Sequence, residues 1–275
     1  MLNFTKMKSY HILLLTFLAL WLGACNQQKK AHFEDAEGHI IDEVRYSNGQ
    51  VKSRIFYLDQ NGADYIQTSY YENGVLQDSM VFKNNKPEGT KKYYDEISGL
   101  THYENYRNGI MQGINEAIYN NGISSYSGYR HQGFKAGEWV FHYPDGRPIT
   151  YEFYDSTGHL KYLRKYDESG YYQQTEGSII IDAAISESEI NAGDSVMLQV
   201  LLANPPGSST TIEISGNVDN EAPVKSSILA DKSRMEIPIY FEQKGKAKID
   251  IYVTVLDNNS EHSETDHKTF NLDVI

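Results

Sequence analysis

Apolar and polar side chains alternate along most of the chain from Tyr46 to the C-terminus. In the segments EWVFHYPDG and HLKYLRKYDESG, aromatic or β-branched residues recur at about every second position, which is the period of a strand with one buried face. Turn-forming residues separate these segments at short intervals. The pattern predicts an all-β protein.

A repeated turn motif runs through the first part of this region. An aromatic residue followed by Asn or Asp and then Gly occurs as YSNG, YENG, YRNG, YNNG and YPDG, and successive turn glycines mostly lie 10 to 13 residues apart, with a longer period of about 24 superposed. Asn-Gly and Asp-Gly tolerate the positive φ angles of tight hairpin turns. The residues of the motif are Tyr46, Gly49, Tyr71, Gly74, Tyr106, Gly109, Gly113, Tyr119, Gly122, Tyr129, Gly133, Gly137, Trp139, Tyr143 and Gly146.

Aromatic residues are concentrated in the repeat region. Nineteen of the 22 tyrosines lie between Tyr46 and Tyr172, so rings rather than aliphatic side chains must supply most contacts between strands. We therefore predict an elongated antiparallel array of β-hairpins over residues 46–172. Because each repeat buries its apolar face only against its neighbours, the end units of such an array need capping.

The composition changes near residues 171–177, where the Tyr and Gly rhythm stops. Seven strand-like runs follow, beginning with SIIIDAAI and ending with KTFNLDVI, and turn-rich pieces such as NPPGSS separate them. Seven short strands predict a β-sandwich over residues 173–275.

The N-terminal segment has the order of a secretory signal: Lys6 and Lys8, an apolar run to Leu22, and small residues before Cys25. The run is too short for a membrane-spanning helix. Residues 1–24 are thus predicted to be a lipoprotein signal peptide, Cys25 the lipidation site and residues 25–45 a lipidated tether. The alternative is a plain secretory signal with an incidental cysteine. Asn26 favours the outer membrane, so we expect a protein of the bacterial cell envelope, periplasmic or surface-facing.

Two resemblances extend these predictions. Tyr, two residues and Gly, followed by a further Gly and a strand rich in Trp or Tyr, resemble the MORN-repeat variant of antitoxin-like proteins of the YwqK type; GFKAGEWVFHYPDG, from Gly133 to Gly146, is the best copy. That resemblance implies neutralisation of a partner protein. INAGDSVMLQVLLAN and FEQKGKAKIDIYVTV resemble bacterial immunoglobulin-like domains, which implies an architecture and no particular ligand.

Charge and motif content narrow the functional classes. The chain has 25 Lys and Arg against 37 Asp and Glu, and removal of the signal makes the balance more acidic, so nucleic acid is not an expected partner. Strings typical of a nucleophile elbow, a phosphate-binding loop or a zinc hydrolase are absent from the sequence. We therefore expect neither enzymatic activity nor a cofactor.

Three groups of residues are candidates for binding roles. The segment EHSETDH, from Glu261 to His267, holds potential metal ligands, yet its place between two strand runs favours a solvated hairpin loop. Trp139 and the tyrosines could form a flat platform for sugar rings or an extended peptide, or they could hold the array together. Structural or exposed roles are expected for four scattered histidines: His102, His131, His142 and His159.

The leading hypothesis is a non-enzymatic lipoprotein that binds an envelope protein or glycan and acts as a scaffold. Exposed sheet edges could recruit an extended segment by strand addition. The alternatives are an envelope hydrolase or transferase that uses carboxylates on the repeat face, and antitoxin-like or immunity-like neutralisation of a partner protein.

Overall fold

The structure is a computed structural model that describes residues 30–35, 38–219, 221 and 224–275. All regular elements in these residues are β-strands, which confirms the all-β prediction. They form one antiparallel sheet of 15 strands and two further sheets, of three and five strands. The chain divides into two compact units, one ending at Tyr94 and the other beginning at Asp95.

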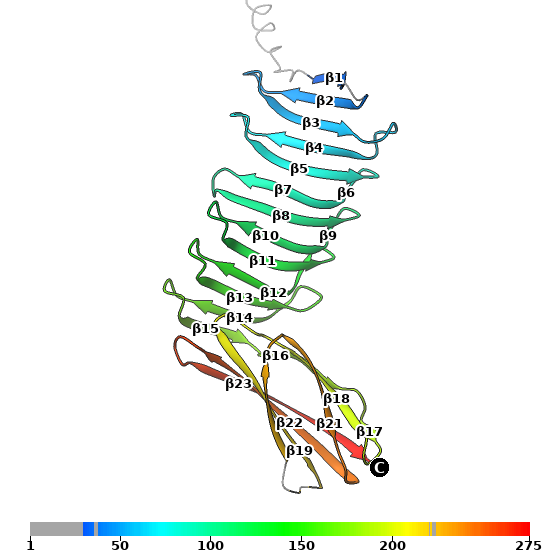
Figure 1. Ribbon diagram of the computed structural model, residues 1–275, viewed down its shortest axis with the longest axis vertical. Helices are drawn as coiled ribbons and strands as arrows, with labels where there is room; N and C mark the ends of the chain where they lie inside the picture. The colour runs from blue at the N-terminus through cyan, green and yellow to red at the C-terminus, as the bar shows by residue number, and fades with distance from the viewer. Residues whose placement is uncertain (1–29, 36–37, 220, 222–223) are drawn as a thin grey trace, which may run out of the picture. The chain divides into compact units, whose positions relative to one another are not determined.

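The first unit contains antiparallel strands that follow one another in the sheet in chain order, except that β5 pairs with β7 and the short β6 pairs with β5 alone (Figure 1). They are β1 (Lys30–Glu34), β2 (Ile40–Arg45), β3 (Val51–Tyr57), β4 (Tyr65–Tyr70), β5 (Leu76–Lys83), β6 (Lys86–Pro87) and β7 (Gly89–Asp95). Strands β1 and β2 lie in the segment predicted to be a tether, so the sheet begins before Tyr46. The polar composition of this segment gave no strand signal. In the structure β1 and β2 pair, and His32 Nδ1 lies 2.7 Å from Asp42 Oδ1 across the pair.

The second unit continues the hairpin pattern and then changes architecture. Its array strands are β8 (Leu100–Arg107), β9 (Ile110–Met111), β10 (Gly113–Ile118), β11 (Ser124–His131), β12 (Phe134–His142), β13 (Pro148–Tyr154), β14 (Leu160–Tyr166) and β15 (Tyr172–Gly177). Neighbouring strands again pair antiparallel, with register shifts at several positions, such as Gly128/Tyr129 and Phe141/His142.

Two kinds of turn reverse the chain. In the first kind both central residues have positive φ, as at Asn108 and Gly109 (50° and 85°), which is the backbone of a two-residue hairpin turn. In the second kind, at YSNG, YENG, YNNG and YPDG, only the glycine has positive φ, and its N–H donates to the carbonyl of the motif tyrosine. The sequence YRNG at Gly109 therefore belongs to a different turn from the four motifs that it resembles.

Tyrosines of the second kind of turn connect successive repeats. The hydroxyl of Tyr46 donates to the carbonyl of Tyr70 (2.8 Å), and that of Tyr71 donates to the carbonyl of Tyr94 (2.7 Å). In the second unit Tyr119 donates in the same way to His142 (2.9 Å). These bonds span 24, 23 and 23 residues, so the longer period seen in the sequence is the spacing of this tyrosine ladder.

Replacement of a ladder tyrosine should have a modest effect on stability. Tyr119→Phe keeps the ring and removes the hydroxyl, leaving the His142 carbonyl without this donor, so we expect the free energy of unfolding to fall by about 1 kcal/mol. Chemical denaturation measures the change, with Tyr171→Phe, at a half-exposed tyrosine, as the control. Equal losses in the two variants would contradict a role for the ladder.

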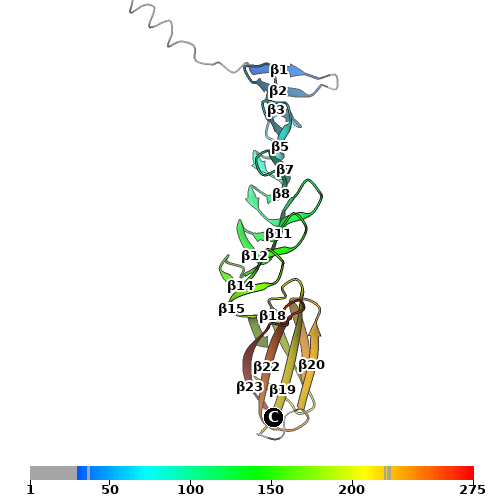
Figure 2. The ribbon, with the colours of Figure 1, turned by 90° about the vertical axis from the view of Figure 1, so that its left-hand side faces the viewer.

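The C-terminal part is a two-sheet sandwich. Its strands are β16 (Ile180–Ile185), β17 (Glu189–Ile190), β18 (Ser195–Leu202), β19 (Ser208–Val218), β20 (Val224–Ala230), β21 (Arg234–Tyr240), β22 (Gly245–Asp257) and β23 (Ser263–Val274). One sheet has the order β16-β18-β21, and the other β17-β23-β22-β19-β20, whose long strands run alongside one another in Figure 2. The seven predicted runs are all present, and the two-residue β17 is added to them.

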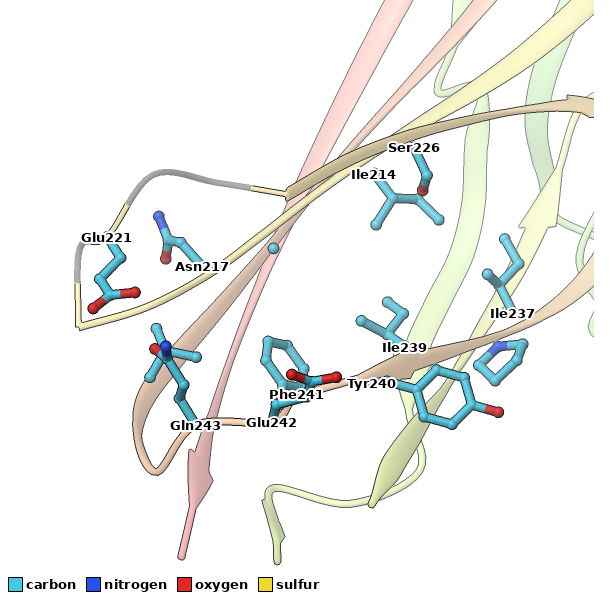
Figure 3. Close-up of a pocket in the computed structure, with 13 residues that line it drawn as sticks. Ile214, Asn217, Glu221, Ser226, Ile237, Ile239, Tyr240, Phe241, Glu242 and Gln243 are labelled. Atoms are coloured by element: carbon cyan, nitrogen blue, oxygen red, sulfur yellow. The ribbon is translucent and has the colours of Figure 1, made fainter. Parts of the chain in front are cut away.

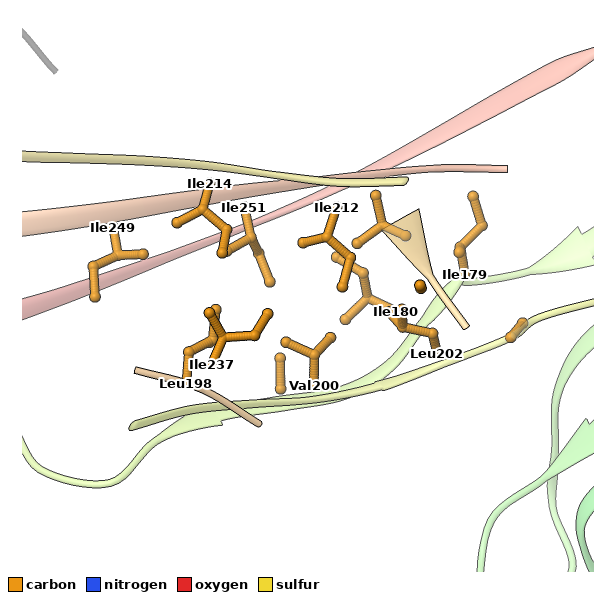
Figure 4. Packing of buried hydrophobic residues seen from close by; sticks show 14 of the residues in the cluster. Ile179, Ile180, Leu198, Val200, Leu202, Ile212, Ile214, Ile237, Ile249 and Ile251 are labelled. Carbon is orange, nitrogen blue, oxygen red and sulfur yellow. The ribbon is translucent and has the colours of Figure 1, made fainter. Parts of the chain in front are cut away.

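The sandwich core follows the alternation in the sequence. Ile212, Ile214, Ile249 and Ile251 face Leu198, Val200 and Ile237 across the space between the sheets (Figure 4), and all of these side chains are buried. Each occupies an inward position of its strand. Burial of this apolar layer supplies most of the packing free energy of the sandwich.

The same core extends into the last array strands. Tyr151, Phe153, Tyr162 and Tyr166 of β13 and β14 are buried in one cluster with the sandwich residues. The Tyr151 hydroxyl accepts from the Asn204 N–H (3.0 Å), and the Tyr166 hydroxyl donates to the Pro206 carbonyl (2.9 Å). The sandwich therefore caps the C-terminal end of the array.

A buried ion pair crosses this junction. Nη2 of Arg164, on β14, donates to Oδ2 of Asp257, at the end of β22 (2.8 Å), and both side chains are almost completely buried. Rings of Tyr166 and Tyr172 lie 5.6 Å and 5.0 Å from the guanidinium carbon. Nε and Nη1 of Arg164 make no hydrogen bond within the described residues. The Asp257 carboxylate is thus the main negative charge that balances the buried Arg164 guanidinium.

Candidate functional site

The predicted lipidation site, Cys25, and the signal peptide lie outside the described residues. Among the described residues, no helix has the length and apolar character needed to cross a bilayer.

The repeat-motif residues have structural positions. All of the motif glycines have positive φ; Gly113 and Gly137 lie within β10 and β12, and the other six lie in turns. Trp139 is only 2% exposed, and its ring lies over Gly128, where a Cβ atom would come within 2.1 Å of the ring. Its Nε1 donates to the Tyr129 carbonyl (3.1 Å). Trp139 therefore holds strands together, and the aromatic platform considered for it is wrong because the ring face is covered.

A lysine covers part of this aromatic cluster. Nζ of Lys135 lies 4.8 Å, 4.9 Å and 5.0 Å from the ring centroids of Trp139, Phe141 and Tyr154, and 2.9 Å from a carboxylate oxygen of Glu152. Such cation–π contacts stabilise a partly desolvated ammonium group. The Lys135 ammonium group thus pairs with aromatic rings and a carboxylate of the array itself.

Three of the four histidines singled out from the sequence, His102, His131 and His142, are partly buried, whereas His159 is exposed. Burial lowers the pKa of His102, partly offset by the negative charges of Asp95 and Glu104, and its Nδ1 lies 3.2 Å from the Tyr126 hydroxyl. Burial also lowers the pKa of His142, against a smaller opposing effect of the Ser124 backbone. Both positions favour neutral imidazole in the folded state.

These two pKa shifts predict acid sensitivity. Below the ordinary histidine pKa of about 6.5 the unfolded chain binds protons that folded His142 resists, so the free energy of unfolding should fall as pH drops through that value toward the lower folded pKa. His142→Phe should reduce the fall measured by thermal denaturation between about pH 7.5 and 5.5. At about pH 8 the imidazole is neutral in both states, which gives the reference comparison. Parallel curves for the two proteins across the acidic range would rule the mechanism out.

The predicted loop from Glu261 to His267 is largely strand, because β23 begins at Ser263. Its two imidazoles pack separately: His262 stacks on Tyr172 (centroids 3.7 Å apart), and His267 stacks on Tyr252 (4.4 Å). The solvated-loop interpretation is therefore wrong for residues 263–267, where exposed and partly buried side chains alternate along β23. The partly buried Glu264 accepts from the Thr175 hydroxyl (2.5 Å), and Asp266 accepts from the Ile180 N–H (3.2 Å). No group of three or more His, Cys, Asp or Glu suited to a metal occurs within the described residues.

Six Asp carboxyl groups have a clear pKa shift in the described part of the chain, and none of them has the raised pKa that suits a general acid. Each Asp with a clear shift has a lowered pKa: Asp95, Asp145, Asp155, Asp250, Asp257 and Asp266. A general acid requires the opposite direction.

A groove in the sandwich is the best candidate for a binding site (Figure 3). It has a volume of about 530 Å³ and lies between β19 and β20 on one side and β21 on the other. Ile214 and Ser226 face Ile237 and Ile239 across it, and the Phe241 ring contributes to the floor. Another hollow, of about 620 Å³, has a mainly polar lining around Asp219, Lys246 and Asp273. An apolar floor with a few polar groups at the rim is the usual character of a binding site.

Two small residues create the groove. Along β19 and β20 the inward positions hold Ile212, Ile214 and Ile228, but also Gly216 and Ser226. A Cβ atom built on Gly216 would lie 3.7 Å from the Phe241 ring, an ordinary contact distance, so the position has room for a side chain. The groove is therefore an unfilled part of the layer between the sheets.

The groove lies between two sheet edges. Strand β20 pairs only with β19, and β21 only with β18, among the described strands. The Met197 carbonyl accepts from the Ser186 N–H, so the backbone polar groups of Met197 point away from β21. Pro238 lies opposite Met197 in the β18–β21 pair, and its nitrogen therefore points to the free edge of β21. Because proline has no N–H, the middle of the β21 edge is a poor template for pairing.

The β20 edge has no such block. The Gly207 carbonyl and the Asp219 N–H, at the two ends of β19, make hydrogen bonds on the β22 side. The backbone N–H and carbonyl groups of the odd-numbered residues of β19 therefore point to β22, and those of the even-numbered residues point to β20. By the register of the β19–β20 pair, Lys225, Ser227 and Leu229 then direct their N–H and carbonyl groups to the free edge. Three consecutive backbone pairing positions are thus available beside the groove.

The rim of the groove is acidic. Glu221 and Glu242 line it, and the lining residues include no Lys, Arg or His. Sequence reasoning expected strand addition at edges of the array and did not find this groove. Pro238 within a strand run and Gly216 after two inward isoleucines were the available signals, but neither shows which strands face each other.

Comparisons with known proteins give no relative: neither a known protein family nor a curated protein matches this chain.

Proposed function

We propose that the protein is a lipid-anchored, non-enzymatic binding and scaffolding module of the bacterial cell envelope. The observation that carries this proposal is the apolar groove beside the open edge of β20. The signal-like N-terminal segment and Cys25 support attachment to a membrane. The tyrosine ladder and the buried junction support a scaffold in which the sandwich is held firmly on the array strands of its own unit.

The anchor can be tested by cell fractionation. The wild-type chain should remain with the membrane fraction and incorporate labelled fatty acid, whereas Cys25→Ser should do neither. Equal fatty-acid labelling of the variant would contradict attachment through Cys25.

Binding can be tested by capture from the cell envelope. The mature Cys25→Ser chain is immobilised and exposed to a detergent extract of envelopes, and retained protein and glycan are identified by mass spectrometry. We expect specific retention of one or a few components. Nothing retained, together with turnover of an envelope polymer, would instead favour the hydrolase alternative.

A further inference from the structure

The groove and the β20 edge can be occupied by a single ligand. A strand added beside β20 would take up the N–H and carbonyl groups of Lys225, Ser227 and Leu229. Its side chains would alternate between the outer face of the sheet and the groove. Those directed inward would meet the unfilled space beside Gly216 and Ser226, above the Phe241 ring.

Charge selects among possible strands. Glu221 and Glu242 on the rim carry no basic partner among the lining residues, and the whole chain has a formal net charge of −12. A segment with Lys or Arg near the apolar side chains would therefore be favoured. A second copy of this chain would bring the same acidic rim, so self-pairing is disfavoured.

We propose that the β20 edge binds an extended segment of a partner protein, with alternating apolar side chains that fill the groove and a basic residue that pairs with Glu221 or Glu242. This inference rests on the proposed binding function and specifies its site and the chemistry of the partner. The backbone bonds give affinity, and the groove and the acidic rim give selectivity.

Synthetic peptides provide the probe. A labelled ten-residue peptide of alternating Val and Thr with a Lys at each end is titrated by fluorescence polarisation against the mature Cys25→Ser chain. A matched peptide with Glu at both ends should bind at least about tenfold more weakly. Equal binding of the two peptides, or no binding of the Lys peptide at millimolar concentration, would overturn the inference.

Variants locate the binding site. Gly216→Phe should fill the groove and weaken binding of the Lys peptide at least about tenfold more than Gly216→Ala, whose single methyl group leaves most of the groove open. Ser227→Pro removes one outward N–H but no bond to β19, and it should weaken binding more than Ser227→Ala does, because Ser227→Ala keeps that N–H. Because the two variants act by different means, failure of one to fold leaves the other decisive. Unchanged binding in a folded variant would overturn the inference.

The capture experiment with envelope extract distinguishes failure of this inference from failure of the proposed function. If the parent chain retains a partner and Gly216→Phe or Ser227→Pro retains it equally, the protein is a binding module whose site lies elsewhere. If the parent retains nothing, the proposed function itself fails. A dimer in light scattering that Ser227→Pro converts to monomer would assign the edge to a second copy and overturn the inference.

Discussion

Asp257→Asn is expected to lower the free energy of unfolding by about 3 to 5 kcal/mol, because it leaves the Arg164 guanidinium buried without its counter-charge. Asparagine keeps the size of the side chain and an oxygen for the turn, where Asp257 Oδ1 accepts from the N–H groups of Asn259 and Ser260. The loss of stability should therefore come from removal of the negative charge and not from disruption of the turn. Denaturation in urea, followed by circular dichroism, measures it.

Two further variants make the result specific. Asp145→Asn removes the carboxylate from an exposed pair with Arg147 and should leave the unfolding transition nearly unchanged, because water screens that pair. Arg164→Met in the Asp257→Asn background removes the uncompensated cation and should recover much of the loss. If the double variant is no more stable than Asp257→Asn alone, the unpaired charge is not the cause.

The same pair adds a pH dependence at the acidic end. Burial acts to raise the pKa of Asp257, but hydrogen bonds from Ser260 and Asn259 and the charge of Arg164 outweigh it, and the pKa is lowered. A lowered folded pKa gives stability that is present above the ordinary value of about 4 and is lost as pH falls toward the folded value. Asp257→Asn should lack this loss.

Gly128→Ala is expected to cost about 3 kcal/mol or more, because its Cβ atom would lie 2.1 Å from the Trp139 ring and the ring cannot remain in place. Gly128 does not have the positive φ of the turn glycines, so the effect comes from the lost ring contact rather than from backbone strain. Gly216→Ala is the matched control, since its added Cβ meets only an ordinary contact.

Tryptophan fluorescence can measure the effect of Gly128→Ala. The chain has two tryptophans, and Trp21 lies in the predicted signal peptide, so Trp139 should be the only tryptophan of the mature protein. Intrinsic fluorescence should therefore shift to longer wavelength when Gly128→Ala expels the ring into water. An unchanged spectrum with unchanged stability would show that the cluster can rearrange around an added methyl group.

Much of the fold follows from the sequence because its signals are local. Alternation marks the strands, Asn-Gly and Asp-Gly mark the reversals, and the loss of the tyrosine rhythm near residue 172 marks the start of the sandwich. Strand β1 was missed because its segment, KAHFE, has almost no apolar periodicity. The strand character of residues 263–267 was missed for a related reason, since both faces of that stretch carry polar side chains.

The candidate site was beyond local signals because it depends on which strands meet. Gly216 and Ser226 create a groove only because β19 and β20 lie opposite β21, and that arrangement is set by the packing of the two sheets. The ion pair of Arg164 and Asp257 joins residues 93 positions apart. Neither residue stands out from its neighbours in the sequence.

The tyrosine ladder also limits how such an array can change its length. Each rung joins a turn to a carbonyl 23 or 24 residues further along, which is two strands away. Gain or loss of a single strand would reverse every later strand and carry the motif turns to the opposite side, where their hydroxyls would find no acceptor. Gene duplications that preserve the fold should therefore add strands in pairs, so length variants of this array are expected to differ by whole two-strand units.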